Sequence, residues 1–195
     1  MSDAVKQLGE QLNKKKIRYA FLDCEDKGFR ILVSPKDKEE VKKLLLHLKW
    51  RKQKGPEEIY LYGMEHFSYF ENDGISLTVC YQVACRSTLH GEWVPLDRKI
   101  NNFALTNVRD VDGVSRLCPE DELCYLFAKC VYTEKGFSAE DKIGIEKVLT
   151  SIDMDALMPK LEGVFFKFSP RILAMAKEGR FDEIIPALWR FGEYE

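Results

Sequence analysis

The densest group of polar, chemically active side chains lies in one short segment, residues 85–98. It contains Arg86 and Arg98, whose planar guanidinium groups suit phosphate and carboxylate groups, together with serine, threonine, histidine and acidic side chains. Loops at strand ends often carry binding residues, and this segment follows a clear strand pattern. The residue types favour the binding of an anion. The alternative is that the segment is a solvated loop.

The strand before this segment has the most regular pattern in the chain. Residues 75–84 alternate between apolar side chains and small or polar ones, and Ser76 and Thr78 belong to the second set. A strict two-residue period is typical of a half-buried strand with one face on the core. We therefore expect a binding site on the polar face that carries Ser76 and Thr78.

Motifs of several common enzyme classes are absent from the sequence. The chain has no phosphate loop, no dinucleotide-binding glycine motif, no zinc-protease motif and no EF-hand. The closest approach to a metal-ligand group is Cys80, Cys85 and His90, whose spacing does not match a zinc site, so we expect no metal there. Cys124 and Cys130 lie in an apolar helical pattern, which predicts small buried side chains.

Composition indicates an ordinary globular protein. Of the 195 residues, 45% are hydrophobic and 32% are charged. No apolar run approaches the roughly 18 residues that a membrane-spanning helix needs, and the first residues do not form a secretory signal. These observations predict a cytoplasmic protein with no membrane partner.

The net charge of −2 hides an asymmetry along the chain. Residues 1–54 carry 15 basic and 8 acidic side chains, whereas residues 55–195 carry 15 and 24. A basic segment can bind an anionic partner, and it can equally consist of lysines that solvate surface helices. We expect a nucleotide or another small anion as the ligand, rather than nucleic acid.

Local patterns predict an α+β fold with a helical second part. A small mixed β-sheet with flanking helices is expected in residues 1–117, and a helical bundle in residues 118–195. Two helix starts are marked by serines. Ser34, followed by a proline, is predicted to cap one helix, and Ser138, followed three residues later by Asp141, is predicted to cap another.

The order of these elements resembles the nucleotidyltransferase fold, and in particular the bacterial nucleotidyltransferase-like proteins. The resemblance rests on a second strand that ends in Ile31-Leu32-Val33-Ser34-Pro35 before a helix. It rests also on Leu117-Cys118-Pro119-Glu120-Asp121-Glu122-Leu123, which opens the helical part. By pattern it covers about residues 15–160.

In that family an Asp-x-Asp pair on the second strand and a third carboxylate on a later strand hold two divalent metal ions. The resemblance places Gly28 and Arg30 where the pair would stand, and residues 76–78 at the later strand, with no carboxylate at any of these positions. An arginine puts a positive charge where a dication would bind. The resemblance therefore implies a degenerate site without the usual metal-dependent catalysis.

Three functions remain open at this point. The leading hypothesis is a binding or regulatory module that holds a nucleotide or other anion without a metal. Its candidate ligand-binding residues are Arg30, Ser76, Thr78, Arg86 and Arg98. The second is an active nucleotidyltransferase that uses Mg²⁺ and a nucleoside triphosphate on a small molecule or protein. Its candidate metal ligands are Asp23, Glu25, Asp26 and Asp73.

The third hypothesis is a protein-interaction scaffold. Apolar residues of the last helix would then form a face for a protein partner or for a homodimer; they are Ile185, Leu188, Trp189 and Phe191. The alternative for these residues is that they dock the helix on its own core.

Overall fold

A computed structural model describes most of the chain. The described residues are 3–25, 28–54, 60–61, 64–65, 67–81, 84–86, 93–95 and 104–192. The chain forms two compact units. The first combines residues 1–84 with 92–118, and the second combines residues 85–91 with 119–195.

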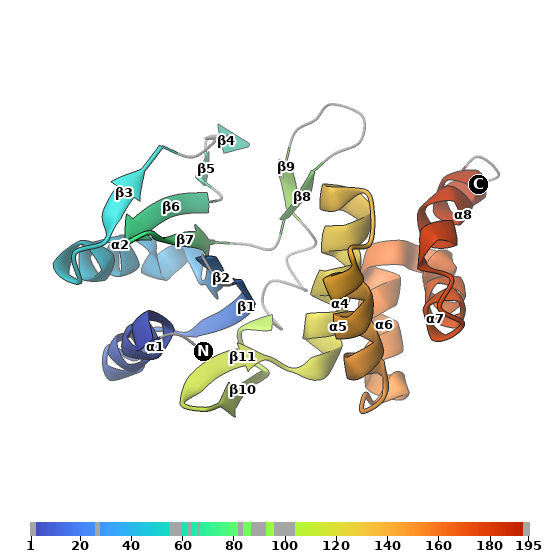
Figure 1. The fold of residues 1–195 in the computed structure, drawn as a ribbon, viewed down its shortest axis with the longest axis horizontal. Helices are drawn as coiled ribbons and strands as arrows, with labels where there is room; N and C mark the ends of the chain where they lie inside the picture. Colours follow the sequence, from blue (N-terminus) through green and yellow to red (C-terminus); the bar gives the residue numbers. More distant parts are fainter. Residues whose placement is uncertain are drawn as a thin grey trace. The chain divides into compact units, whose positions relative to one another are not determined.

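The first unit is built on a seven-stranded mixed sheet (Figure 1). Its strands are β1 (Tyr19–Glu25), β2 (Gly28–Val33), β3 (Arg51–Gln53), β6 (Phe67–Asn72), β7 (Ile75–Cys80), β10 (Val108–Val111) and β11 (Val114–Leu117). They lie in the order β10-β11-β1-β2-β7-β6-β3. The β1–β11 and β2–β7 pairs are parallel and the other pairs are antiparallel. Two short pairs stand apart, β4 (Tyr60–Leu61) with β5 (Met64–Glu65) and β8 (Ala84–Arg86) with β9 (Trp93–Pro95).

Two helices, α1 (Asp3–Lys14) and α2 (Lys38–His47), contribute to the core of this unit. Each has an apolar stripe at helical spacing, and these stripes are buried together with one face of the sheet. Phe29, Ile31 and Val33 of β2 belong to the same core. Successive side chains of a strand point to opposite faces, so Gly28 and Arg30 lie on the sheet face away from this core.

The start of α2 differs from the sequence-based expectation. Ser34 precedes a 3₁₀ turn, Pro35–Asp37, and its side chain makes no capping hydrogen bond. Ser34 thus stands at the predicted N-cap position ahead of Pro35, but its side chain does not cap the helix. Proline presets the backbone angle of the first turn, which lets this helix begin through the 3₁₀ turn without a side-chain acceptor.

The close packing of α1 against the sheet predicts an unusual response to Gly9→Ala. In a helix this change normally adds about 0.5–1 kcal/mol of stability. At Gly9, however, an added Cβ would stand 2.8 Å from Val114 Cγ1 and 2.9 Å from the Tyr19 hydroxyl. We expect Gly9→Ala to lower the free energy of unfolding by about 1–2 kcal/mol, because overpacking a tight core costs more than the helix gains. Urea denaturation measures the change.

A helical glycine with open space around it serves as the matched control. Gly144 lies in α5 (Ala139–Leu149), and a Cβ there would meet no atom within 4 Å. Gly144→Ala should therefore raise the free energy of unfolding by about 0.5–1 kcal/mol. Equal effects of the two substitutions would contradict the proposed packing of α1.

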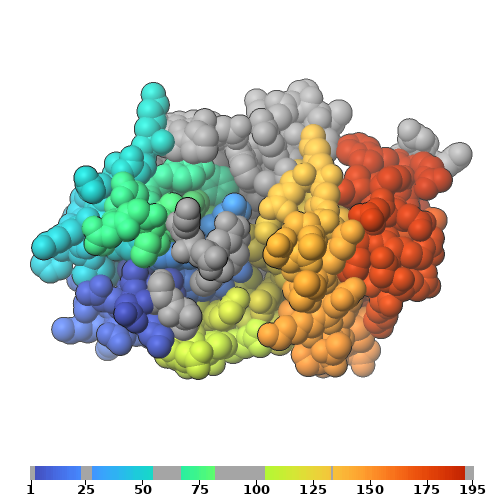
Figure 2. All heavy atoms as spheres, viewed as in Figure 1, coloured from blue at the N-terminus to red at the C-terminus, as the bar shows by residue number. Residues whose placement is uncertain are grey.

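The second unit is helical. Its elements are α4 (Pro119–Ala128), a π-helical turn (Lys129–Glu134), α5, α6 (Met154–Phe165), a 3₁₀ turn (Phe166–Phe168), α7 (Ser169–Lys177) and α8 (Phe181–Gly192). The spheres of α6 to α8, coloured orange to red, form a closely packed surface in Figure 2. Together with the mixed sheet, this unit confirms the predicted α+β class with a helical C-terminal part. Within the described residues, no helix has the length and apolar character needed to cross a bilayer.

The apolar residues of α8 divide between core and surface. Ile185, Leu188 and Phe191 are half-buried, and the Phe191 ring lies 5.3 Å from that of Phe168, centroid to centroid. Trp189 is 54% exposed. The helix therefore docks through most of these side chains and leaves one large aromatic at the surface.

Candidate functional site

The parallel pairing of β2 with β7 brings four candidate positions together. Gly28 is the direct partner of Ser76, and Arg30 is the direct partner of Thr78. The residues between them, Phe29 and Leu77, are buried. The four positions therefore form a two-by-two group on the opposite face of the sheet, with one guanidinium and two hydroxyl groups.

Neighbouring strands extend this group into a row across the sheet. Asp23 of β1 is the backbone partner of Arg30, following an irregularity in the pairing after Phe21. Tyr69 of β6 is the partner of Thr78 on the other side. Four strands thus contribute consecutive positions to one line, in the order Asp23, Arg30, Thr78 and Tyr69.

Gly28 permits a close approach between the two central strands. A Cβ at this position would clash with the Ser76 hydroxyl and would stand 3.3 Å from the Ser76 carbonyl oxygen. Any larger residue at position 28 would require Ser76 to move. The Ser76 hydroxyl therefore lies against the backbone of β2 at Gly28, next to the half-buried Arg30 side chain.

The other sequence-predicted residues either lie outside this row or have side chains outside the described part of the structure. Asp73 is exposed in the turn before β7, with a positive φ of 50°, and lies outside the paired part of the row. Asp23 and Glu25 belong to β1, and Arg86 ends β8, but the side chains of all three lie outside the described part of the structure. The remaining candidates, Asp26 and Arg98, also lie outside the described residues, as do Cys85 and His90.

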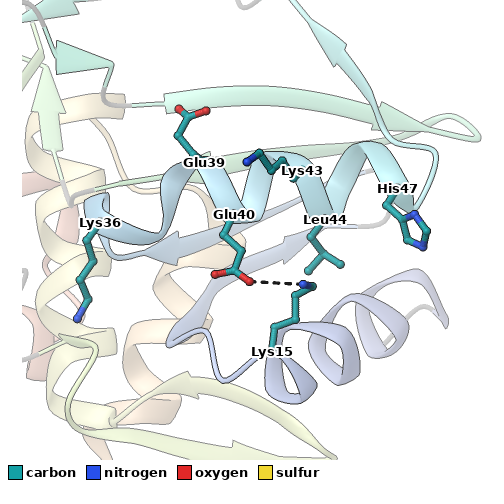
Figure 3. A pocket seen from close by; sticks show the side chains of 7 residues that line it. All are labelled: Lys15, Lys36, Glu39, Glu40, Lys43, Leu44 and His47. Atoms are coloured by element: carbon teal, nitrogen blue, oxygen red, sulfur yellow. Dashed lines mark hydrogen bonds and ion pairs between the residues drawn. The ribbon is translucent and has the colours of Figure 1, made fainter.

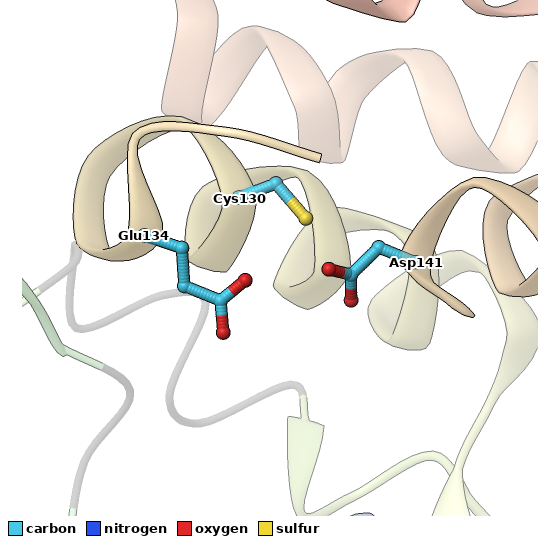
Figure 4. Close-up of side chains that lie close together, drawn as sticks. All are labelled: Cys130, Glu134 and Asp141. Carbon is cyan, nitrogen blue, oxygen red and sulfur yellow. The ribbon is translucent and has the colours of Figure 1, made fainter. Parts of the chain in front are cut away.

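A separate cluster of titratable groups occurs in the second unit. The potential ligand atoms of Cys130, Glu134 and Asp141 lie within 4.8 Å of one another (Figure 4). Lys129 Nζ lies 3.3 Å from Glu134 Oε1 and 3.1 Å from Asp141 Oδ1. The second oxygen of Asp141 accepts hydrogen bonds from the amide and hydroxyl of Ser138. A lysine ammonium therefore already supplies the positive charge that these carboxylates require.

The pKa values in this cluster indicate a structural role. Burial, aided by the nearby Asp141 and Glu134 carboxylates, raises the pKa of the Cys130 thiol to about 12. The thiol is consequently protonated at neutral pH and is neither a nucleophile nor a thiolate ligand. Both Cys124 and Cys130 are buried, as their helical pattern predicts.

Burial by itself would also raise the pKa of Asp141. The hydrogen bonds from Ser138 and Lys129, together with the Lys129 charge, outweigh burial and hold this pKa below its usual value. Burial raises the pKa of Glu134, against the opposing effect of Lys129. The sequence signals only part of this cluster, namely the capping box of Ser138 and Asp141, which the structure confirms. The pairing with Lys129 joins two helical segments and has no local signal.

Comparison with solved structures finds similar folds among nucleotidyltransferases. The antibiotic-resistance factor ANT(2'')-Ia has a TM-score of 0.53 and 9% identity, over 92% of this chain and 98% of that chain. Its complex with adenylyl-2''-tobramycin has a TM-score of 0.53 and 7% identity, over 81% of this chain and 92% of that chain. The lincosamide antibiotic adenylyltransferase LnuA, bound to lincomycin, has a TM-score of 0.50 and 11% identity, over 78% of this chain and 98% of that chain.

Similarity at the level of sequence is much weaker. No protein-family model matches the chain, and no curated protein is similar enough to match. The structural neighbours therefore establish a nucleotidyltransferase-like fold, in agreement with the resemblance found in the sequence.

Proposed function

We propose that this chain is a nucleotidyltransferase-fold protein that binds a nucleotide, or another phosphate-bearing anion, without a metal ion. The observation that carries the proposal is the register of β2 and β7, which sets Arg30 beside Thr78 and Gly28 beside Ser76 on one sheet face. We propose further that residues 1–117 hold this site and that residues 118–195 form a helical subdomain.

The residues of this face suit phosphate oxygens. A guanidinium group donates two parallel hydrogen bonds to a phosphate, and such charge-assisted bonds are about twice as strong as neutral ones. The hydroxyls of Ser76 and Thr78 are further donors. Gly28 has no side chain, which lets the Ser76 hydroxyl lie close to the backbone of β2 on this face.

The same four positions do not suit magnesium. Mg²⁺ takes oxygen ligands and is usually bound through one or two carboxylates together with substrate phosphates. Gly28 offers no ligand atom, Arg30 repels a cation, and the two remaining groups are neutral hydroxyls. The metal-free proposal therefore follows from the donor set at these positions.

Isothermal titration with ATP, CTP, GTP and UTP, in magnesium and in EDTA, tests the proposal. We expect at least one nucleotide to bind in EDTA. Arg30→Gln should weaken this binding by about 10-fold or more, because a hydrogen bond to a charged group contributes about 1.5–3 kcal/mol. Lys52→Gln is the control and should bind like the unchanged chain, because Lys52 is exposed on β3 and is the partner of the core residue Phe70, on the sheet face away from Arg30.

Strictly magnesium-dependent binding would contradict this function. It would favour the second hypothesis, an active nucleotidyltransferase with ligands among Asp23, Glu25, Asp26 and Asp73. The register supports Asp23 as the first residue to substitute in that case, because it is the backbone partner of Arg30.

A further inference from the structure

A second basic feature of the first unit lies away from the Arg30 face. A groove of about 670 Å³ is formed where the end of α1 meets α2 (Figure 3). Its lining residues are Lys15, Lys36, Glu39, Glu40, Lys43, Leu44 and His47. Because α1 and α2 pack on the core face of the sheet and Arg30 lies on the other face, this groove is distinct from the site proposed above.

The carboxylates of the groove are already paired with lysines. Lys15 Nζ lies 3.4 Å from Glu40 Oε1, and Lys42 Nζ lies 3.6 Å from Glu39 Oε1. Within the described part of the chain, the ammonium groups of Lys36 and Lys43 make no ion pair or hydrogen bond. The groove therefore holds two cations that are available to an external anion.

The spacing of these two cations indicates the form of that anion. Lys36 and Lys43 are seven residues apart, which corresponds to about 11 Å along the helix. Two cations separated along a groove match the repeated charges of a phosphate backbone. Lys14 and Lys16, both exposed beside Lys15, add positive charge at the α1 end.

The other lining groups distinguish between kinds of polyanion. Protein partners are usually held by tryptophan, tyrosine or arginine anchors in pockets, and the lining residues include none of these. Binding through a phosphate backbone needs only lysines, because it is driven by the release of counterions. We propose that this groove binds the phosphate backbone of a nucleic acid without preference for base sequence.

This proposal departs from the expectation, based on sequence, that nucleic acid is not a ligand. Counting lysines along the chain does not reveal which of them line a hollow and which are already paired. The structure separates Lys36 and Lys43 from lysines such as Lys15 and Lys42, whose charge is already satisfied.

Fluorescence anisotropy with a labelled oligothymidylate tests the groove. An oligothymidylate of about 12 nucleotides is long enough to cover a site of a few nucleotides. Two phosphate contacts predict that affinity falls about sevenfold or more when salt rises from about 50 to about 200 mM. Lys36→Gln/Lys43→Gln should weaken binding about tenfold at the lower salt and make the salt dependence shallower. A duplex of the same length should bind at least as tightly as the single strand, because its phosphate charges are denser along the axis.

The matched control removes the same charge elsewhere. Lys147 and Lys177 are exposed on helices of the second unit, so Lys147→Gln/Lys177→Gln should leave oligothymidylate binding unchanged. Circular dichroism confirms that each variant is folded.

Four results would overturn the proposal. The first is that oligothymidylate does not bind at low salt, and the second is that the groove and control double variants lose the same affinity. The third and fourth are that polyglutamate, or ATP, displaces the labelled oligothymidylate as well as unlabelled oligothymidylate does. The third result would identify an acidic protein segment as the partner, and the fourth a mononucleotide.

Discussion

Lys160→Met is expected to lower the free energy of unfolding by about 3 kcal/mol, because it leaves a buried carboxylate without its cation. Lys160 Nζ of α6 lies 2.7 Å from Asp121 Oδ1 of α4, and the Asp121 side chain is only 5% exposed. Methionine keeps most of the length of the side chain, so the loss arises from the charge. Urea denaturation followed by helical circular dichroism measures it.

Two further variants make this prediction specific. Asp121→Leu/Lys160→Met should recover most of the lost stability, since a buried ion pair replaced by apolar groups is often nearly neutral. Lys142→Met breaks a bridge of similar length, 2.9 Å to Asp182, whose side chain is 84% exposed. It should cost less than about 1 kcal/mol. Equal losses for Lys142→Met and Lys160→Met would show that burial does not determine the strength of the α4–α6 pair.

Lys129→Met is expected to destabilise the protein by about 2–3 kcal/mol at neutral pH, because the largely buried Asp141 then loses its cation while keeping its hydrogen bonds to Ser138. The pKa of Asp141 lies below its usual value partly because of Lys129. A lowered pKa stabilises the fold above about pH 4, and this stabilisation is lost as pH falls through the folded-state pKa.

The variant should therefore approach the unchanged chain in stability under acid conditions. Without Lys129, only the hydrogen bonds from Ser138 oppose the effect of burial on the pKa of Asp141, so protonation of Asp141 removes less stability. Unfolding measured from neutral pH to about pH 3 should show the difference between the two proteins shrinking below about pH 4. A difference that is constant over this range would contradict the assigned role of Lys129. Lys135→Met, at an exposed position just after the same turn, is the control.

Local sequence signals predict the elements of this fold better than their pairing. The alternation after Ile75 correctly predicts a strand, and Ser138 with Asp141 correctly predicts a capping box, because both depend on neighbours in the chain. Ser34 has the residue type of a cap, but the proline after it directs the backbone into a 3₁₀ turn instead. Residue type therefore predicts a helix start without determining how its amides are satisfied.

The candidate site depends on contacts between distant segments, so the sequence predicts it only in part. The sequence indicates Arg30, Ser76 and Thr78 as binding residues, yet nothing local specifies that β2 and β7 pair in parallel with Gly28 opposite Ser76. Parallel strands are joined by long connections, which leaves their register to the packing of the whole sheet. The unpaired state of Lys36 and Lys43 likewise depends on partners chosen in three dimensions.

The order of the sheet leaves β10 and β3 at its two open edges. Both carry charge where a foreign strand would add, with Arg51 and Lys52 exposed on β3 and Arg109 and Asp110 on β10. Charged edge strands discourage other chains from extending a sheet, and short edges offer few hydrogen bonds to them. The charges at the two ends of this sheet therefore oppose its edge-to-edge growth into fibrils.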